Sequence, residues 1–243
     1  LASHQLRTPL STINWYAEML LAGDAGKITE DQKKYLQEIY HGNQRMVDLV
    51  NALLNVSRLE LGTFVVEPEQ IDILKITRSV LDELKPKVDE KKLIVKEEHQ
   101  GDLPEINADP KLTRIIIQNL LSNAVKYTPE SGKVDVGISL KHKGELVEGK
   151  PVIKDSVLIS VKDTGYGIPE HQQDKMFTKL FRADNVKEKD TEGTGLGLYI
   201  IKSILNQCNG KVWFKSIEDK GTTFYILMPV SGMIKKEGSK QLE

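Results

Sequence analysis

Apolar residues recur every three or four positions over the first sixty residues of the chain. In the first segment they fall at Leu6, Leu10, Ile13, Ala17 and Leu20, which is the seam of an amphipathic, heptad-like helix. A stretch with two glycines then interrupts the pattern, and the pattern resumes after it. We therefore expect two helices joined by a short loop, which is a helical hairpin.

The second helix of this hairpin should begin at a capping box, because Gln32 follows Thr29 at the spacing of that motif. A single hairpin cannot cover so wide an apolar stripe. We therefore expect residues 1–61 to form an antiparallel helical hairpin that dimerises into a four-helix bundle. The seam positions of the second helix are Leu36, Ile39, Asn43, Met46, Val50 and Leu53.

The pattern changes from about residue 62, where helical and strand-like runs alternate irregularly. Asp72 and the pair Asp109-Pro110 are typical helix starts, for helices that run to about Lys91 and Thr128. Pro86 is expected to kink or break the first of these. Two further helices should follow Pro169 and Gly195. The remaining apolar runs read as strands at 63–68, 92–100, 132–144, 156–165, 211–217 and 222–230, with a polar loop at 145–155.

This mixture lacks a strict strand–helix–strand alternation, so it favours an α+β sandwich over a doubly wound fold. The predicted organisation is multidomain. A helical domain at 1–61 is followed by a linker at 62–68, an α/β sandwich at 69–230 and a flexible tail at 231–243.

Composition narrows the class of protein. The chain has 243 residues with 34 basic and 35 acidic side chains, so nothing favours a nucleic-acid or membrane-surface partner. Its single cysteine, Cys208, allows no internal disulfide and favours a reducing compartment. No apolar run approaches the ~20 residues that span a bilayer. The chain opens inside a helical pattern without a methionine, which suggests a fragment of a longer protein.

His4 lies on a different face of the first helix from the apolar seam. Residues four apart share a helix face, so His4, Thr8 and Ser11 form a stripe beside that seam. A histidine with a structural role in the core would lie on the seam. The pattern therefore predicts an exposed imidazole with a nucleophilic nitrogen near pH 7, close to a bend at Pro9.

Two segments of the second domain carry chemistry that suits a nucleotide. In "NLLSNAVKYT", Asn119, Asn123 and Lys126 share a helix face, where amide oxygens can ligate Mg²⁺ and an ammonium can offset phosphate charge. In "DTGYGIP", Asp163 ends an apolar strand, and nearby glycines let the backbone approach a flat ligand. By themselves, these segments also fit an ordinary polar helix face and a plain turn.

A third segment, "GTGLGL", opens a helix whose backbone N–H groups can bind phosphate. Its spacing matches neither the dinucleotide-binding nor the Walker phosphate-binding pattern, and alone it could be a glycine-rich hinge. The polar stretch at 182–192 before it could close over a nucleotide as a lid.

Together and in this order, these segments resemble the cytoplasmic transmitter region of sensor histidine kinases. "SHQLRTP" resembles the phosphoacceptor box, "NLLSNAVKYT" the N box and "DTGYGIP" the first glycine box. "MFTKLFR" resembles the F box, "GTGLGL" the second glycine box and "GTTF" the closing glycine–threonine element. The resemblance extends to about Pro229.

The resemblance implies an ATP-dependent protein-histidine kinase. Residues 1–61 would be the dimerising phosphoacceptor domain, and 69–230 a catalytic ATP-binding domain with the Bergerat fold of gyrase-type ATPases. The expected reaction is autophosphorylation of His4, followed by transfer to an aspartate on the receiver domain of a response regulator. The protein would be a homodimer and the cytoplasmic part of a membrane-bound sensor, with no direct membrane contact in this fragment.

The resemblance also implies roles for individual residues toward ATP and Mg²⁺. Asp163 would hold the adenine amine, Asn123 the metal, and Arg182 the γ-phosphate. Because an amide cannot activate water as the glutamate of related ATPases does at the position of Asn119, phosphate should be kept for a protein acceptor. The other expected nucleotide-binding residues are Asn119, Lys126, Tyr127, Gly165, Gly167, Gly193, Thr194, Gly195, Leu196, Gly197 and Thr222.

Gln5 departs from the family pattern, in which an acidic residue usually follows the histidine. An amide can orient the ring but has no basic site, so we expect slower autophosphorylation. Thr8, one turn after His4, could position water for dephosphorylation of the regulator, or its hydroxyl could bond its own helix. Gln5 alone favours the alternative of a nucleotide-binding pseudokinase or signalling scaffold. An ATPase or chaperone of the same superfamily is disfavoured by Asn119.

Overall fold

The computed structural model describes residues 2–187, 193–238 and 242, with side chains from Gln5 onward. The chain divides into two compact units, one up to Ser57 and the other from Arg58 to Leu242. The domain bounds expected from the sequence stay a prediction, and the two units are described separately. Among the described residues, no helix combines the length and apolar character needed to cross a membrane.

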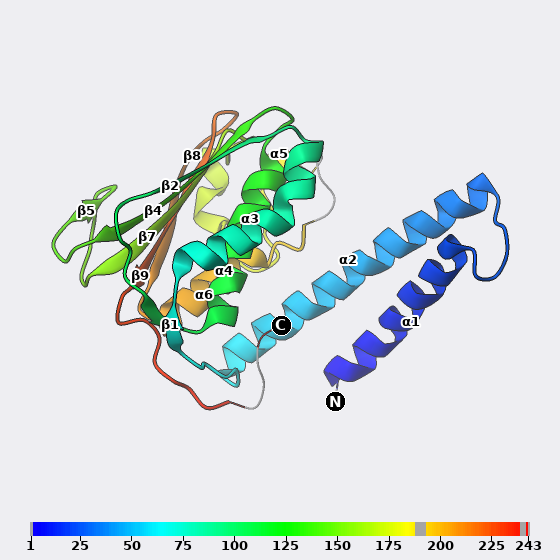
Figure 1. Cartoon of the computed structure of the whole chain (residues 1–243), viewed down its shortest axis with the longest axis horizontal. Helices are drawn as coiled ribbons and strands as arrows, with labels where there is room; N and C mark the ends of the chain where they lie inside the picture. The colour runs from blue at the N-terminus through cyan, green and yellow to red at the C-terminus, as the bar shows by residue number, and fades with distance from the viewer. Residues whose placement is uncertain (1, 188–192, 239–241, 243) are drawn as a thin grey trace. The chain divides into compact units, whose positions relative to one another are not determined.

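The first unit is a helical hairpin, as the apolar pattern predicts. Helix α1 (Ala2–Ala22) runs antiparallel to α2 (Glu30–Leu61), as Figure 1 shows. The capping box is confirmed, because the Thr29 amide donates to Gln32 Oε1 at 2.8 Å and the Gln32 amide to Thr29 Oγ1 at 3.2 Å. Helix α1 continues without interruption past Pro9.

Polar contacts join the two helices inside the hairpin. Asn43 is 2% exposed, and its Nδ2 donates to the Leu10 carbonyl and to Asn14 Oδ1, each at 2.6 Å. Further along, Arg7 Nε donates to Asn51 Oδ1 at 3.0 Å. A buried asparagine in a helical seam costs stability but fixes register, so these contacts align α1 with α2.

Much of the apolar seam of the hairpin nevertheless lies exposed on the single chain. Five seam side chains retain 41–52% of their accessible surface. An apolar stripe of this kind on a helix is normally covered by another element. The five are Leu6, Ile13, Ile39, Met46 and Leu53.

The second unit is built on a mixed sheet of five strands in the order β2-β4-β7-β9-β8. The first pair is parallel and the other three pairs are antiparallel. The sheet agrees with the predicted α+β class, and four of its five strands lie within the predicted runs. The fifth, β9, begins one residue before its run. The strands are β2 (Ile94–His99), β4 (Lys133–Lys141), β7 (Ser156–Asp163), β8 (Lys211–Ile217) and β9 (Gly221–Pro229).

Three helices cover one face of this sheet (Figure 1): α3 (Ile73–Glu90), α4 (Pro110–Tyr127) and α6 (Gly197–Gln207). Alternate residues of the strands point toward them, and truncating one such buried side chain typically costs about 2–5 kcal/mol. Two short helices, η1 (Glu170–Lys175) and α5 (Asp184–Lys187), precede α6. Fully or almost fully buried residues include Ile116, Leu120, Val134, Val136, Ile159, Val161, Ile201 and Ile204.

Aspartates begin two of the helices, as predicted. Asp72 Oδ1 accepts from the amides of Leu74 and Lys75, at 2.9 and 3.2 Å. Asp109 caps α4 in the same way and in addition accepts from the Glu67 amide at 2.8 Å. Helix α3 continues through Pro86, so the expected break there is absent.

The structure differs from the sequence prediction where short strands pair over long distances. The sequence predicts a strand that ends at Pro68, but the strand β1 (Glu69–Ile71) begins only after it and pairs with β3 (Ile106–Ala108). Within the expected linker, Val66 pairs with Lys236 of the expected tail through two hydrogen bonds of 3.0 Å. The polar loop contains a small hairpin, β5 (Leu146–Val147) with β6 (Lys150–Pro151).

Candidate nucleotide and phosphoacceptor sites

Asp163 lies at the end of β7 and is only 7% exposed. Its Oδ1 accepts from the amides of Gly165, at 2.8 Å, and of Thr222, at 3.1 Å. Burial raises the pKa of the Asp163 carboxyl to about 6, and the two backbone hydrogen bonds offset only part of that effect. Both bonds use Oδ1, so Oδ2 is the oxygen that neither of them engages.

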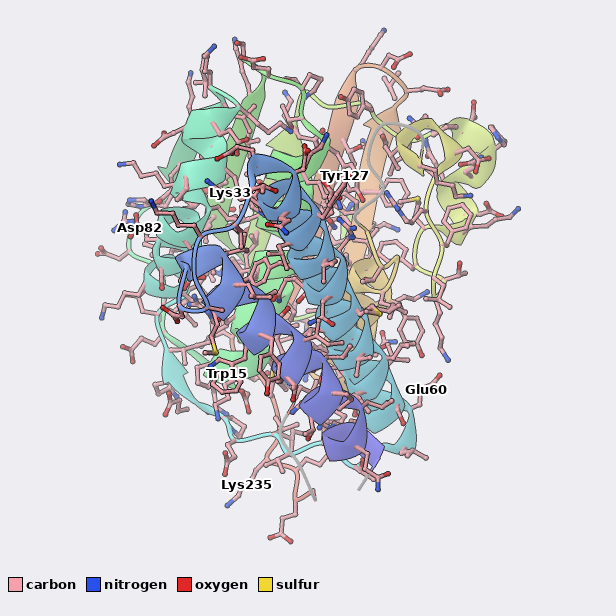
Figure 2. All side chains as sticks on the ribbon, turned by 90° about the vertical axis from the view of Figure 1, so that its right-hand side faces the viewer. Trp15, Lys33, Glu60, Asp82, Tyr127 and Lys235 are labelled. Atoms are coloured by element: carbon pink, nitrogen blue, oxygen red, sulfur yellow. The ribbon has the colours of Figure 1, made fainter. Side chains whose placement is uncertain are left out.

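Gly165 packs directly against the end of α4. A β-carbon at this position would collide with the carbonyl oxygen of Tyr127 and lie 2.7 Å from Asp163 Oδ1. Tyr127, labelled in Figure 2, is the last residue of α4, and its carbonyl accepts from the Tyr166 amide at 3.2 Å. The N box and the first glycine box, separate in sequence, are therefore in contact.

Gly167 packs closely against the backbone of another segment, and its expected contact with a nucleotide stays a prediction. Its φ is +61°, and a β-carbon would collide with the carbonyl of Ile217, the last residue of β8. A β-carbon on Gly221, the first residue of β9, would collide with the Asp163 carbonyl in the same way. These glycines let the turn between β8 and β9 pack against the loop that follows Asp163.

The polar face of α4 points toward the start of α6. Asn119 Nδ2 donates to the Ile115 carbonyl at 2.8 Å, and a β-carbon on Gly197 would collide with Asn119 Oδ1. Gly197 is the first residue of α6, where free backbone N–H groups attract anions. Asn123 follows Asn119 by one turn of α4 and is partly exposed.

A lysine from outside the predicted site holds the end of α4. Lys91 Nζ donates to the carbonyls of Val125, at 2.8 Å, and Lys126, at 2.9 Å. These carbonyls lie at the C-terminal end of a helix, where a cation is favourable. The ammonium of Lys126 lies 5.5 Å from the centre of the Tyr127 ring.

The second glycine box contacts both the F box and the N box. A β-carbon on Gly193 would lie 3.0 Å from Arg182 Nε and 3.2 Å from the Tyr127 hydroxyl. Gly195 has φ +67° and leaves no room for a side chain against the backbone of Leu180 and Phe181. These contacts bring the expected phosphate-side residues together.

Thr194 and Leu196 complete this box in different ways. The Leu196 amide donates to Thr194 Oγ1 at 3.3 Å, which shapes the turn into α6. The Leu196 side chain is 1% exposed and belongs to the hydrophobic core. Only its backbone is therefore available to a ligand. The expected lid at 182–192 falls partly on residues 188–192, which lie outside the described residues.

These residues fit a magnesium nucleotide. A buried carboxylate suits the exocyclic amine of a base, and glycines whose positions exclude a β-carbon line the segments around it. Within the described ranges, no three His, Cys, Asp or Glu side chains gather to hold a metal. Amide oxygens and nucleotide phosphates are among the oxygen ligands that the hard cation Mg²⁺ accepts.

The expected phosphoacceptor residues belong to the other unit. His4 is in the first turn of α1, but its side chain lies outside the described residues. Gln5 and Thr8 are exposed on α1. Ser11, one turn further along the stripe, is exposed as well.

Sequence reasoning missed the residues that support the loop after Asp163. Gln173 Nε2 donates to the carbonyls of Ile168, at 3.0 Å, and Ser216, at 3.2 Å. Asn185 Nδ2 donates to the carbonyls of Tyr166 and Gly167, at 3.3 and 3.1 Å. No short-range pattern indicates these contacts, because each one joins separate segments.

Comparison with protein families agrees with this arrangement. Residues 108–232 match the family described as "Histidine kinase-, DNA gyrase B-, and HSP90-like ATPase". The chain belongs to this family. Residues 2–62 match the "His Kinase A (phospho-acceptor) domain". In this order, the two domains form the transmitter region of two-component sensor histidine kinases.

Individual relatives are sensor kinases. Sensor histidine kinase WalK of Bacillus subtilis is 34% identical over 93% of this chain and 35% of its own length. Adaptive-response sensory kinase SasA of Rippkaea orientalis is 32% identical over 94% of this chain and 56% of its own length. The chain thus spans about a third to a little over half of these relatives.

A solved structure supports the same fold for the whole chain. Full-length ShkA in complex with AMPPNP is 26% identical and superposes with a TM-score of 0.74. The match covers 97% of this chain and 46% of ShkA. The predicted succession of a helical hairpin and a gyrase-type ATP-binding domain is confirmed.

Proposed function

We propose that this chain is an ATP-dependent protein-histidine kinase. It autophosphorylates His4 and passes the phosphoryl group to an aspartate on the receiver domain of a response regulator. The observation that carries the proposal is the buried Asp163 carboxylate, held by Gly165 and Thr222 beside the end of α4. ATP as phosphate donor fits a cytoplasmic location for the transmitter part of a membrane-bound sensor.

Asp163 would recognise the base. Its ionised carboxylate accepts hydrogen bonds but cannot donate them, which selects an exocyclic amine over a carbonyl. Oδ1 is engaged by the two backbone amides, so Oδ2 is oriented to accept from the adenine amine. Gly165 keeps the adjoining backbone close, and Thr222 is the cross-strand neighbour of Asp163, since the pair before them is Thr223 with Lys162.

The phosphate side would be formed by α4, the F box and the start of α6. Asn123 would supply an amide oxygen to Mg²⁺, which neutralises phosphate charge when bound. Arg182 would contact the γ-phosphate, and the backbone N–H groups from Gly193 to Gly197 the other phosphate oxygens. The remaining phosphate-side residues are Asn119, Lys126, Tyr127 and Thr194.

His4 would be the nucleophile. A neutral imidazole nitrogen attacks the γ-phosphorus, the new P–N bond forms, and the bond to the leaving ADP oxygen breaks. Gln5 can accept a hydrogen bond from the other ring nitrogen and so fix the tautomer. The phosphoryl group then moves from His4 to a carboxylate oxygen of the receiver aspartate, which leaves the imidazole free again.

The hairpin would dimerise through its exposed seam. The five half-exposed apolar side chains of α1 and α2 provide a stripe that a second copy of the hairpin can cover. Such a dimer is a four-helix bundle. Thr8, exposed on the same α1 face as His4, would position a water molecule that dephosphorylates the regulator, so the protein would also act as a phosphatase.

The test is incubation with γ-labelled Mg-ATP, followed by mapping of acid-labile, alkali-stable phosphate. We expect label on the wild-type protein and none on His4→Ala, with the same nucleotide affinity for both. ATP binding without label would instead support a nucleotide-binding scaffold. ATP hydrolysis without histidine phosphate would support an ATPase. Either outcome would reject the kinase.

A further inference from the structure

The hydroxyl of Ser216 connects three segments behind Asp163. Ser216 is in β8, and its Oγ accepts from the Ile168 amide at 2.8 Å. The same Oγ lies 2.8 Å from Thr222 Oγ1 and 3.2 Å from the Gly221 carbonyl. Ser216 and Thr222 are direct cross-strand partners in β8 and β9, so their hydroxyls lie side by side.

The surrounding backbone holds this hydroxyl in place. The turn between β8 and β9 packs against the loop after Asp163 through Gly167 and Gly221, and the Asp219 amide donates to the Tyr166 carbonyl at 2.8 Å. Gln173 bridges the Ile168 and Ser216 carbonyls. Ser216 therefore has little freedom to take new partners.

The Ser216 hydroxyl has a single proton, and the direction of that proton determines what the neighbouring Thr222 hydroxyl can donate to. A serine hydroxyl donates one hydrogen bond and accepts two. One acceptor site of Ser216 is used by the Ile168 amide, and its proton can go to Gly221 or to Thr222 Oγ1. The contact with Thr222 is the shorter of the two. When Ser216 donates to Thr222, the proton of the Thr222 hydroxyl is available to another acceptor.

That available proton lies on the same side of the sheet as the Asp163 carboxylate. Lys162 of β7 pairs with Thr223 of β9, so the next residues, Asp163 and Thr222, are cross-strand neighbours, and the Thr222 amide donates to Asp163 Oδ1 at 3.1 Å. Adenine presents an amine donor next to a ring-nitrogen acceptor. Hypoxanthine and guanine present a carbonyl acceptor next to a ring N–H donor. A carboxylate acceptor beside a hydroxyl donor is complementary to adenine and opposed to the other two bases.

We propose that Ser216 is a positioning residue for base selection: its hydroxyl turns the Thr222 hydroxyl into a donor for the adenine ring nitrogen. This inference rests on the proposed function, because it assumes that Asp163 receives the adenine amine. Ser216 itself does not touch the base. Without the Ser216 hydroxyl, the Thr222 hydroxyl is no longer directed toward the base and can donate to other acceptors. Affinity is therefore lost only for bases whose ring nitrogen would have accepted that hydrogen bond.

The experiment measures binding of three magnesium nucleotides to the full chain by titration calorimetry. ATP offers the amine and the ring acceptor, purine riboside triphosphate offers only the ring acceptor, and ITP offers neither. For Ser216→Ala we expect about tenfold weaker binding of the first two and less than about twofold change for ITP. Ser216→Thr, which keeps a hydroxyl, should restore the wild-type pattern.

The matched control is Ser160→Ala. Ser160 is in β7, three residues before Asp163 and so on the opposite face of that strand, and its hydroxyl donates to the Gly137 carbonyl at 3.3 Å. This variant should bind all three nucleotides as the wild type does. A loss in Ser216→Ala that is equal for the three nucleotides would mean a purely structural role and would overturn the inference.

Two further results separate the possible failures. If the wild-type protein binds no ATP, the proposed function itself fails. If Ser216→Ala does not fold, Ser216→Cys replaces it, because a thiol of similar size is only a weak donor. We then expect an intermediate loss of ATP and purine riboside triphosphate relative to ITP, and an unchanged ratio would overturn the inference.

Discussion

The amide oxygen of Asn119 occupies the space that a β-carbon on Gly197 would need. One residue belongs to α4 and the other begins α6, so the N box and the second glycine box form one surface. Asn119 is itself held by its bond to the Ile115 carbonyl. The start of α6 can therefore keep its position only while residue 197 has no side chain.

Gly197→Ala should displace the start of α6 or the Asn119 side chain. We expect at least about tenfold weaker ATP binding, since the backbone N–H groups there would no longer face the phosphates. Binding can be measured by calorimetry. Gly42→Ala in α2 is the matched control, because its β-carbon would meet only Arg45 Nη2, at 3.6 Å. In a helix this change should stabilise by about 0.5–1 kcal/mol. If both variants changed the ATP affinity equally, the loss could not be attributed to a collision between residue 197 and Asn119.

Asp163→Asn should stabilise the free protein while it weakens nucleotide binding. Burial raises the pKa of Asp163 to about 6, so at pH 8 the folded protein carries a poorly solvated charge. We expect the variant to gain about 2–3 kcal/mol in unfolding free energy at pH 8. Urea unfolding and calorimetric ATP titration measure the two effects. A variant that lost both stability and affinity would show that the carboxylate serves mainly as a structural acceptor.

The same carboxyl predicts a pH dependence. Because its pKa is higher in the folded than in the unfolded protein, its contribution to stability is present below about pH 4 and is lost as the pH rises through about 6. Nucleotide binding should follow the opposite course, because a protonated carboxyl is a poor acceptor. ATP affinity should fall as the pH drops below about 6, and the fall should be much smaller in Asp163→Asn.

Gln5→Glu should speed autophosphorylation. A carboxylate beside His4 can take a ring proton, which an amide cannot do. We therefore expect an increase of about three- to tenfold, below the usual contribution of a general base. Initial rates of labelling report it. Rates equal to or lower than those of the wild type would reject a basic role at this position. Gln5 is exposed, so the melting temperature should stay nearly constant.

Thr8→Ala should separate the two activities of the phosphoacceptor helix. Loss of the hydroxyl should reduce dephosphorylation of the regulator by about tenfold and leave labelling of His4 unchanged. Both can be followed with a purified receiver domain that has been phosphorylated beforehand. Thr12→Ala is a suitable control, since the Thr12 hydroxyl donates to the Thr8 carbonyl within the same helix. An unaltered phosphatase rate in Thr8→Ala would indicate that the Thr8 hydroxyl only forms a hydrogen bond within its own helix.

The elements that could be predicted from sequence are those with local causes. The capping box at Thr29 and the caps at Asp72 and Asp109 depend on atoms two or three residues away, so short patterns indicate them. The pairing of β1 with β3 and of Val66 with Lys236 depends on segments far apart in the chain. Their residues carry no local signal, and the sequence places Val66 in a linker and Lys236 in a tail.

The same distinction applies to the candidate site. Asp163, Asn119 and the glycines belong to short recognisable segments, and the structure brings these segments into contact. Ser216 and Gln173 act through carbonyls, amides and a hydroxyl of other loops. Nothing in their sequence neighbourhood distinguishes them from ordinary polar residues. The segments that the structure brings together could therefore be predicted, but the residues that support them from other loops could not.

The pairing of Val66 with Lys236 joins the beginning of the second unit to its end through backbone hydrogen bonds. Phe64 is fully buried, the Lys236 ammonium lies 4.5 Å from the centre of its ring, and Met233 is 3% exposed. A fragment that contains only residues 69–230 would lack the pairing of Val66 with Lys236 and would expose part of the hydrophobic core. A piece from 63 to 238 would retain it. Such a module can be moved between proteins intact, because its entry and exit points lie next to each other.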